Sequence, residues 1–240
     1  IPPPEERPMI ATVINALAIL AGSLVGLFLR KGLPEKAKAA VFSAAGLISL
    51  VLGMRMALGT AHVLAMALAL IIGGLAGTAL DIEGAVLRLG EWLKRRFAKG
   101  DDSGTFAAGF LDSSVLFCVG AMALVGSFKA GVEGDYELIL TKSVMDGFMA
   151  VILTGAMGVG VAFSALAVLV YQGVLTIAAV WIEPWVSELM LAELSAVGGV
   201  LVIMIGINLL GLRKIPTADF LPALVLAAGL VALVPFVSFL

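Results

Sequence analysis

Apolar stretches long enough to cross a membrane follow one another along this chain, with short polar segments between them. A helix of about 20 residues crosses a hydrocarbon core of roughly 30 Å. Because 61% of the residues are hydrophobic and only 13% are charged, such stretches make up most of the sequence. We therefore expect an all-α fold, and specifically a polytopic helical membrane protein.

Turn-forming residues divide the apolar sequence into eight expected spans. Gly and Pro mark the breaks, among them Pro34, Gly59, Pro184 and Pro216. The expected spans lie near residues 10–29, 38–58, 61–80, 106–128, 137–157, 160–182, 189–211 and 219–238.

Basic residues gather in alternate loops, and cytoplasmic loops carry the excess of Lys and Arg. One set of loops holds Arg30, Lys31, Lys36, Lys38, Arg88, Lys94, Arg95, Arg96, Lys99, Arg213 and Lys214. The opposite set holds little beyond Arg7 and Lys129. This bias supports an even number of spans. It predicts a multi-pass protein of a prokaryotic cytoplasmic (inner) membrane, with both termini outside the cytoplasm.

Two groups of spans resemble each other. Residues 15–26, NALAILAGSLVG, align without a gap with residues 164–175, SALAVLVYQGVL, and the segment from Phe42 aligns with the segment from Leu194. Segments rich in Ala, Leu, Val and Gly also match by chance. Because the copies are five spans apart, they would point in opposite directions. Inverted-topology repeats of this kind build the substrate sites of many transporters near the bilayer midplane.

The expected organisation is a single membrane domain over residues 9–240, preceded by residues 1–8 as an extension ahead of a natural start at Met9. No signal peptide is expected there, since IPPPEERP is rich in Pro and acidic. Within the domain we expect repeat A over residues 9–81, a cytoplasmic amphipathic helix over 82–103, a central pair of spans over 104–158 and repeat B over 159–240.

The expected helix over residues 82–103 places apolar residues on one stripe and gathers basic residues towards its end. The stripe consists of Ile82, Val86, Leu89, Leu93 and Phe97. A helix of this kind lies on the anionic cytoplasmic leaflet. We expect membrane lipid as its partner and topological anchoring as its role.

Charged residues inside the spans mark candidate sites, because each costs roughly 2.5 to 3.5 kcal/mol to insert. In the fifth span, Lys142 and Asp146 lie four residues apart on one helix face, close enough to pair. Asp112 lies in the cytoplasmic half of the fourth span. Two carboxylates near a shared axis can bind a monovalent cation or carry protons. The alternatives are that Lys142 and Asp146 form a pair that only fixes packing, and that Asp112 snorkels or caps a helix.

Uncharged polar residues in the spans allow two interpretations, since they either line a path or hydrogen-bond between helices. The candidates are Asn15, Ser23, Ser164, Gln172 and Asn208. Glu193 is expected to be exposed at the outer end of the seventh span, and Arg55 to snorkel outward from the second.

Other kinds of site have no residues to build them. The chain has one Cys, Cys118, and one His, His62, which exclude an internal disulfide and a metal site built from Cys and His. No nucleophile and base are arranged together, and no Gly-rich string ends in the GK[ST] of a phosphate loop. We therefore expect no enzyme activity, no cofactor, no resident metal and no nucleic-acid partner.

Four strings in the second half of the chain are distinctive: FCVGAMALVGSFKAGVEGD, TKSVMDGF, GVGVAFSALAVLVYQG and AVGGVLVIMIGINLLG. In these strings the chain resembles a prokaryotic integral membrane family of unknown function, typified by YqgA and YdfK. The resemblance covers nearly all of the sequence from Met9 and implies no substrate. The family's pattern falls here on Asn15, Asp112, Cys118, Gly120, Lys142, Ser143, Asp146, Gly147, Gln172, Gly173, Glu193 and Asn208.

We expect a secondary transporter or ion-coupled carrier of an unknown small solute, with a polar site near the bilayer midplane. The expected binding residues are Asp146, Lys142, Asp112, Ser143, Asn15, Ser164, Gln172 and Asn208. Two alternatives stay open. A channel, often a homo-oligomer, would line a pore around the same axis. A non-transporting scaffold or signalling protein would have a closed centre, with the Lys142–Asp146 pair and no cavity.

Overall fold

The computed structural model describes residues 9–30, 34–97, 105–119, 121–182, 184 and 186–233. The elements in chain order are α1 (Ile10–Arg30), α2 (Glu35–Ala57), α3 (Val63–Ala79), α4 (Ile82–Phe97), α5 (Phe106–Cys118), α6 (Ala121–Val132), α7 (Glu137–Met157), the 3₁₀ helix η1 (Val159–Phe163), α8 (Ser164–Ile182), α9 (Glu188–Leu209), the 3₁₀ helix η3 (Thr217–Phe220) and α10 (Pro222–Leu233). This part of the chain contains no strand, so the expected all-α class is confirmed. The expected extension over residues 1–8 lies outside the described residues, as do residues 98–103 of the expected amphipathic helix.

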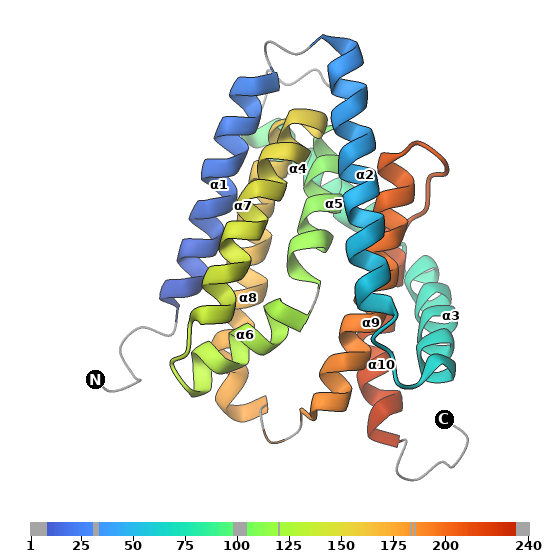
Figure 1. The fold of residues 1–240 in the computed structure, drawn as a ribbon. Coiled ribbons are helices and arrows are strands. Elements are labelled where there is room, and N and C mark those ends of the chain that lie inside the picture. Colours follow the sequence, from blue (N-terminus) through green and yellow to red (C-terminus); the bar gives the residue numbers. More distant parts are fainter. Residues whose placement is uncertain are drawn as a thin grey trace.

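The long helices form two groups that stand side by side in Figure 1. In the first group, α1 packs against α7 and α8; in the second, α2 packs against α9, and α3 against α10. α5 and α6 lie between the groups. Gly22 allows the close contact of α1 and α7, since a Cβ there would overlap the backbone carbonyl of Gly147. The apolar core runs through both groups, with Ile19, Val168 and Ile205 among its fully buried side chains.

Glycines also bring α2 and α9 together, in an antiparallel crossing. A Cβ added at Gly53 would lie 2.6 Å from the carbonyl oxygen of Gly199, and one added at Gly206 would lie 2.9 Å from the carbonyl oxygen of Gly46. Because real Cβ atoms do not approach that closely, these two helices meet backbone to backbone. Small residues at the interface are typical of helix pairs in membranes, where dispersion contacts drive association.

Four helical segments are long and apolar enough to cross a membrane: α1, α7, Val159–Ala179 and α9. α3 and α4 are bent by 56° at their junction and bring the number to five if the pair is one span. The apolar segments Phe42–Ala57, Phe106–Cys118 and Thr217–Ala232 are shorter. Within the described residues, length and composition therefore agree with a polytopic membrane protein but do not reach the expected eight spans.

The expected fourth span over residues 106–128 is not continuous. α5 ends at Cys118, Val119 is extended (φ −89°, ψ 131°), and α6 begins at Ala121 in a new direction (Figure 1). Both helices are apolar, so hydropathy alone predicts one continuous span across the break. The expected single helix is therefore corrected to two half-length helices.

α4 forms at the place expected for the amphipathic helix, but its apolar stripe is divided. Leu93 is buried against Phe106 and Phe110 of α5, whereas Leu89 and Phe97 are exposed. Part of the stripe that we expected to contact lipid is therefore used to pack α4 on the rest of the protein.

Candidate functional site

The charged pair of α7 is buried inside the helix bundle. Lys142 donates from Nζ to Asp146 Oδ2 across one helical turn, and both residues are less than one-tenth exposed. The four-residue spacing predicted this contact, and it is present. The other carboxylate oxygen, Asp146 Oδ1, makes no hydrogen bond within the described part of the chain.

A chain of amides and hydroxyls holds Asp146 from the side of α1 and α8. Asn15 Nδ2 donates to Asp146 Oδ2 at 3.1 Å and to Gln172 Oε1 at 3.0 Å. Gln172 Nε2 in turn donates to Thr12 Oγ1 at 3.1 Å. All of these side chains are buried. The network joins three helices and fixes the orientation of the carboxylate.

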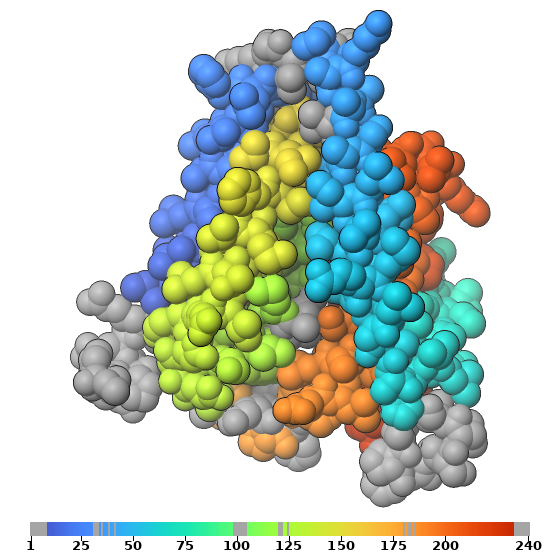
Figure 2. Space-filling view, in the orientation of Figure 1, coloured from blue at the N-terminus to red at the C-terminus, as the bar shows by residue number. Residues whose placement is uncertain are grey.

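A cavity of about 390 Å³ opens beside this pair, and we call it the central pocket. It lies between the two helix groups, and Figure 2 shows the hollow between the surfaces of α7 and α2. Among the described residues, the charged members of its lining are Lys142, Asp146 and Arg55, and the rest of the lining is mainly apolar. Four methionines contribute flexible apolar surface: Met56, Met122, Met145 and Met149.

The break between α5 and α6 lies at the central pocket. Phe117 and Val119 line the pocket from the end of α5, and Met122 lines it from the start of α6. Non-helical backbone at membrane depth is tolerated only where it is buried in protein or faces a cavity. The first N–H groups of α6 and the last carbonyls of α5 are thereby left for polar partners other than their own helix.

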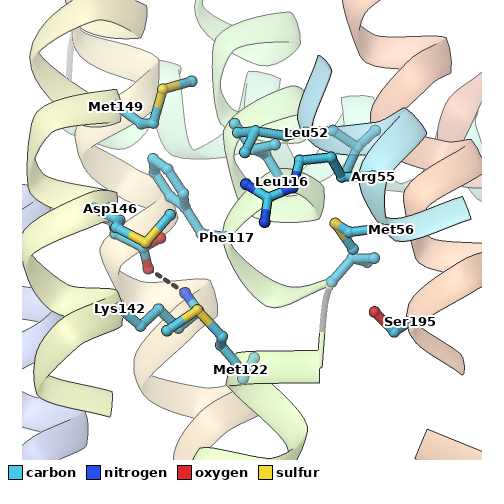
Figure 3. A pocket seen from close by; sticks show the side chains of 14 residues that line it. Leu52, Arg55, Met56, Leu116, Phe117, Met122, Lys142, Asp146, Met149 and Ser195 are labelled. Atoms are coloured by element: carbon cyan, nitrogen blue, oxygen red, sulfur yellow. Dashed lines mark hydrogen bonds and ion pairs between the residues drawn. The ribbon is translucent and has the colours of Figure 1, made fainter. Parts of the chain in front are cut away.

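Arg55 was expected to snorkel outward from α2. Its side chain is exposed, but the guanidinium points into the central pocket, toward the side where Asp146 lies (Figure 3). The exposed side chain therefore borders the cavity in front of α2, and outward snorkelling of Arg55 stays a prediction. Two cationic residues and one acidic residue therefore line the same space.

Several other expected site residues have structural partners. Ser143 and Ser164 donate to the backbone carbonyls of Ile139 and Val161, at 2.7 and 2.6 Å. Ser23 is fully buried, and its hydroxyl has no hydrogen-bond partner in the described part of the chain. None of these serines lines the central pocket.

Asn208 holds the turn after α9. Its Nδ2 donates to Ile215 O at 2.9 Å and to Thr217 Oγ1 at 3.3 Å, and its Oδ1 accepts from Ile215 N at 2.7 Å. Its amide is thus fully engaged in loop structure.

Asp112 does not share the central pocket with Asp146. It is buried on α5 and lines a second cavity of about 210 Å³, together with Glu83, Asn208 and Lys214. The expected charged residues are therefore divided between two cavities, and α5 contributes to both. Asn15, Ser143, Ser164 and Gln172 line neither cavity.

Glu193 was expected to be exposed, and this is wrong: it is 1% exposed. Its carboxylate accepts hydrogen bonds from Thr60 Oγ1 at 2.6 Å and from the backbone N–H groups of Ala61 and His62 at 2.6 and 2.9 Å. The turn between α2 and α3 folds over the start of α9, which hydropathy along one helix does not reveal. Glu193 therefore fixes the entry into α3.

Sequence reasoning missed Thr12 and the pocket position of Arg55. Thr12 lies three residues before Asn15, so both lie on one face of α1, and this spacing would have placed Thr12 beside the Asn15 network. Nothing in the sequence marks Arg55 as a pocket residue.

In the described residues, no group of three or more His, Cys, Asp or Glu side chains is placed to hold a metal ion.

The chain is similar to proteins whose functions are unknown. Residues 10–232 match the family model described as "Protein of unknown function (DUF554)". Over 224 residues the chain is 30% identical to the "Uncharacterized membrane protein YdfK" of Bacillus subtilis (strain 168), covering 91% of this chain and 93% of that protein.

A second relative, the "Uncharacterized protein YqgA" of Escherichia coli (strain K12), is 33% identical over 227 residues, covering 93% of this chain and 97% of that protein. No solved structure matches. The resemblance inferred from the central strings is therefore confirmed, and the chain belongs to the DUF554 family of membrane proteins of unknown function.

Proposed function

We propose that this protein is a secondary carrier that moves a small solute through the central pocket by alternating access. The observation that carries the proposal is the Lys142–Asp146 pair, which is buried and yet faces a cavity of about 390 Å³ between two helix groups. A pair that only fixed packing would be enclosed by side chains. Here both partners contribute to the wall of an open space.

The interrupted helix supports a binding role for the pocket. Transporter sites are commonly formed by discontinuous helices, whose free N–H and carbonyl groups replace the hydration of the solute. The α5–α6 break meets the same cavity as Lys142 and Asp146. Backbone groups and charged side chains can therefore act on one bound molecule.

Reciprocal glycine contacts support the inverted repeat. Gly46 contacts Gly206, and Gly53 contacts Gly199. Each of these glycines of α2 therefore contacts the residue of α9 that corresponds to the other glycine of α2. Such mutual pairing is what a two-fold axis between two copies produces. These contacts fit an alignment in which Gly46 corresponds to Gly199. That alignment is shifted by one residue from the sequence alignment that places Phe42 on Leu194.

The contact between α1 and α8 fits the same axis. The aligned sequences place Asn15 on Ser164 and Ser23 on Gln172. Asn15 is bonded to Gln172, the counterpart of Ser23. The reciprocal pair is not hydrogen-bonded in the described residues, since Ser164 donates to Val161 and the Ser23 hydroxyl has no partner. Ile19 and Val168, which correspond to each other, are both buried midway between these positions.

The charges of the pocket favour a solute with an anionic group. Arg55 on α2 and Lys142 on α7 face one acid, Asp146, so the lining is positive overall. Asn15 donates to Asp146, Asp146 holds Lys142 in place, and Arg55 approaches from the opposite helix group. A carboxylate or similar group would be held between the two cations, with the methionines around the apolar remainder of the solute.

Loop charge supports the orientation. Arg30 ends α1 and Lys36 lies in the first turn of α2 at one end of the bundle, whereas Asp135 and Glu188 lie near the starts of α7 and α9 at the opposite end (Figure 1). With the basic end in the cytoplasm, α1 begins and α10 ends toward the outside.

The two alternative functions predict different properties of the central pocket. A scaffold would have the Lys142–Asp146 pair, which is present, and a closed centre, which the cavity argues against. A channel would give unitary current steps in planar bilayers, whereas a carrier would give none.

Thiol labelling from both membrane faces tests the carrier. Cys118, the single native cysteine, is replaced by Ala, and Ser195 in the pocket wall by Cys. We expect a membrane-impermeant maleimide to modify Ser195→Cys in right-side-out and in inside-out vesicles. The matched controls Ser187→Cys and Lys36→Cys, exposed at opposite ends, are expected to react from one face each. Reaction of Ser195→Cys from one face only, or from neither, would contradict the proposal.

A further inference from the structure

The second cavity contains a carboxylate without a partner. Asp112 is 7% exposed, and no hydrogen bond or ion pair reaches it from any described residue. Burying an unpaired carboxylate is unfavourable, because the charge loses its hydration and gains no partner in return. Such a group is retained where something neutralises it.

The surroundings of Asp112 are negative overall. Glu83 lines the same cavity from the start of α4, and Asp219 of η3 adjoins it by accepting from Glu83 N at 2.7 Å. Lys214, from the loop after α9, is the one described cation of the lining and is exposed. The other elements that contribute to the lining, α2, α7 and α9, bring no charged group.

Most neighbouring polar groups already have partners and are not free to bind Asp112. One oxygen of Glu83 accepts from Ala218 N at 2.9 Å, and the amide of Asn208 is used by the turn before η3. The free acceptors are thus the carboxylate of Asp112 and the second oxygen of Glu83.

We propose that the cavity around Asp112 and Glu83 binds a monovalent cation, either a proton or Na⁺. A divalent ion is disfavoured because Lys214 offsets one of the two carboxylates of the lining, Asp112 and Glu83, and leaves one net negative charge. A single small cation neutralises Asp112, while Lys214 is placed to supply the countercharge after the cation leaves.

The position of the cavity links it to the central pocket through α5. Asp112 lies on α5, and Leu116 lies one turn later on the same helix and lines the central pocket. Occupation of the second cavity therefore acts on the half-helix that bounds the first. This coupling role rests on the carrier function proposed above, whereas cation binding itself does not.

The test measures binding on the purified full chain, without transport. Thermal unfolding is followed in NaCl and in choline chloride at constant ionic strength, and infrared difference spectra are recorded between acidic and alkaline buffer. Wild type is compared with Asp112→Asn and with Glu91→Gln, an exposed acid on α4 that serves as the matched control.

For a Na⁺ site, we expect NaCl to raise the unfolding temperature of wild type and Glu91→Gln, and this shift to be lost in Asp112→Asn. For a proton site, we expect no Na⁺ shift, but a carboxylic-acid band that persists at about pH 6, where an ordinary Asp is ionised, and is absent from Asp112→Asn. Either result supports the cavity. Identical Na⁺ responses and identical infrared bands in wild type and Asp112→Asn would overturn it.

A second variant keeps the test decisive if Asp112→Asn does not fold. Lys214→Gln removes the competing charge at an exposed position, so we expect it to bind Na⁺ more tightly or to hold its proton to higher pH. An unchanged response in Lys214→Gln would contradict the proposal. Failure of two-sided labelling at Ser195→Cys would instead contradict the carrier function and leave these binding results standing.

Discussion

The carboxylate of Glu193 offers a sharp test of the packing between α9 and the turn that precedes α3. It accepts two backbone N–H groups and one hydroxyl, at 2.6 to 2.9 Å. Hydrogen bonds to a charged group contribute about 1.5 to 3 kcal/mol each. Two perturbations separate the charge from the contacts: Glu193→Gln and Glu193→Ala.

The expected magnitudes follow from which bonds each variant keeps. In Glu193→Gln, the amide oxygen still accepts from Ala61 and His62, so the loss is the charge assistance, about 1.5 kcal/mol. In Glu193→Ala, all three bonds are lost. Because Ala61 is exposed and Thr60 is partly exposed, water replaces some of them, and we expect about 3 kcal/mol.

The assay is reversible unfolding in mixed micelles, with the fraction of SDS as the denaturant. Glu188→Gln, an exposed acid at the start of the same helix, serves as control and is expected to stay within about 0.5 kcal/mol of wild type. The expected order of stability is control, then Glu193→Gln, then Glu193→Ala. If both Glu193 variants unfolded with the control, the carboxylate would not hold the turn.

Three further predictions address the pair, the glycine crossing and pH. Lys142→Met leaves Asp146 buried without its cation, and we expect it to lower the free energy of unfolding by about 3 kcal/mol. The double variant Lys142→Met/Asp146→Leu should recover most of this loss, as a double-mutant cycle in the same assay would show. Gly53→Leu and Gly199→Leu are expected to destabilise equally, because each places a side chain against the other's backbone; unequal losses in thermal unfolding would argue against the reciprocal crossing. The backbone N–H of Glu137 holds the pKa of Asp135 below its ordinary value, so ionised Asp135 stabilises the fold. This stabilisation is present above about pH 4 and fades as the pH falls through the lowered pKa. Asp135→Asn should therefore unfold at a lower temperature than wild type at neutral pH, and at the same temperature in acid.

Helix positions followed closely from the sequence because apolar runs and turn residues carry that information locally. The span expected over residues 137–157 is α7, and the span expected near 189–211 is α9. The break at Val119 could not be found in the same way, since both of its arms are apolar. Hydropathy measures the preference of residues for the bilayer, and it does not tell whether the backbone is continuous.

The candidate site was predictable only where its contacts are local. Lys142 and Asp146 pair within one turn, so their spacing was enough. The bond from Asn15 to Asp146 joins helices far apart in the chain. The repeat predicts that these polar residues lie near a common axis, and it does not predict that these two bond to each other. Asp112 and Asp146 looked equivalent in sequence, yet they line different cavities. The part of α5 around Asp112 lines the second cavity, and only the end of α5, from Leu116, reaches the central pocket with Asp146.

Alternating access requires that the two helix groups move relative to each other around the central pocket. The most direct measurement is the distance distribution between spin labels at Leu58→Cys and Leu140→Cys, on α2's end and on α7, in the Cys118→Ala background in lipid nanodiscs. A control pair within the first group, Leu24→Cys and Phe148→Cys, should give one narrow distribution. We expect two populations for the pair across the pocket. A single narrow distribution like that of the control would show that the two helix groups do not move.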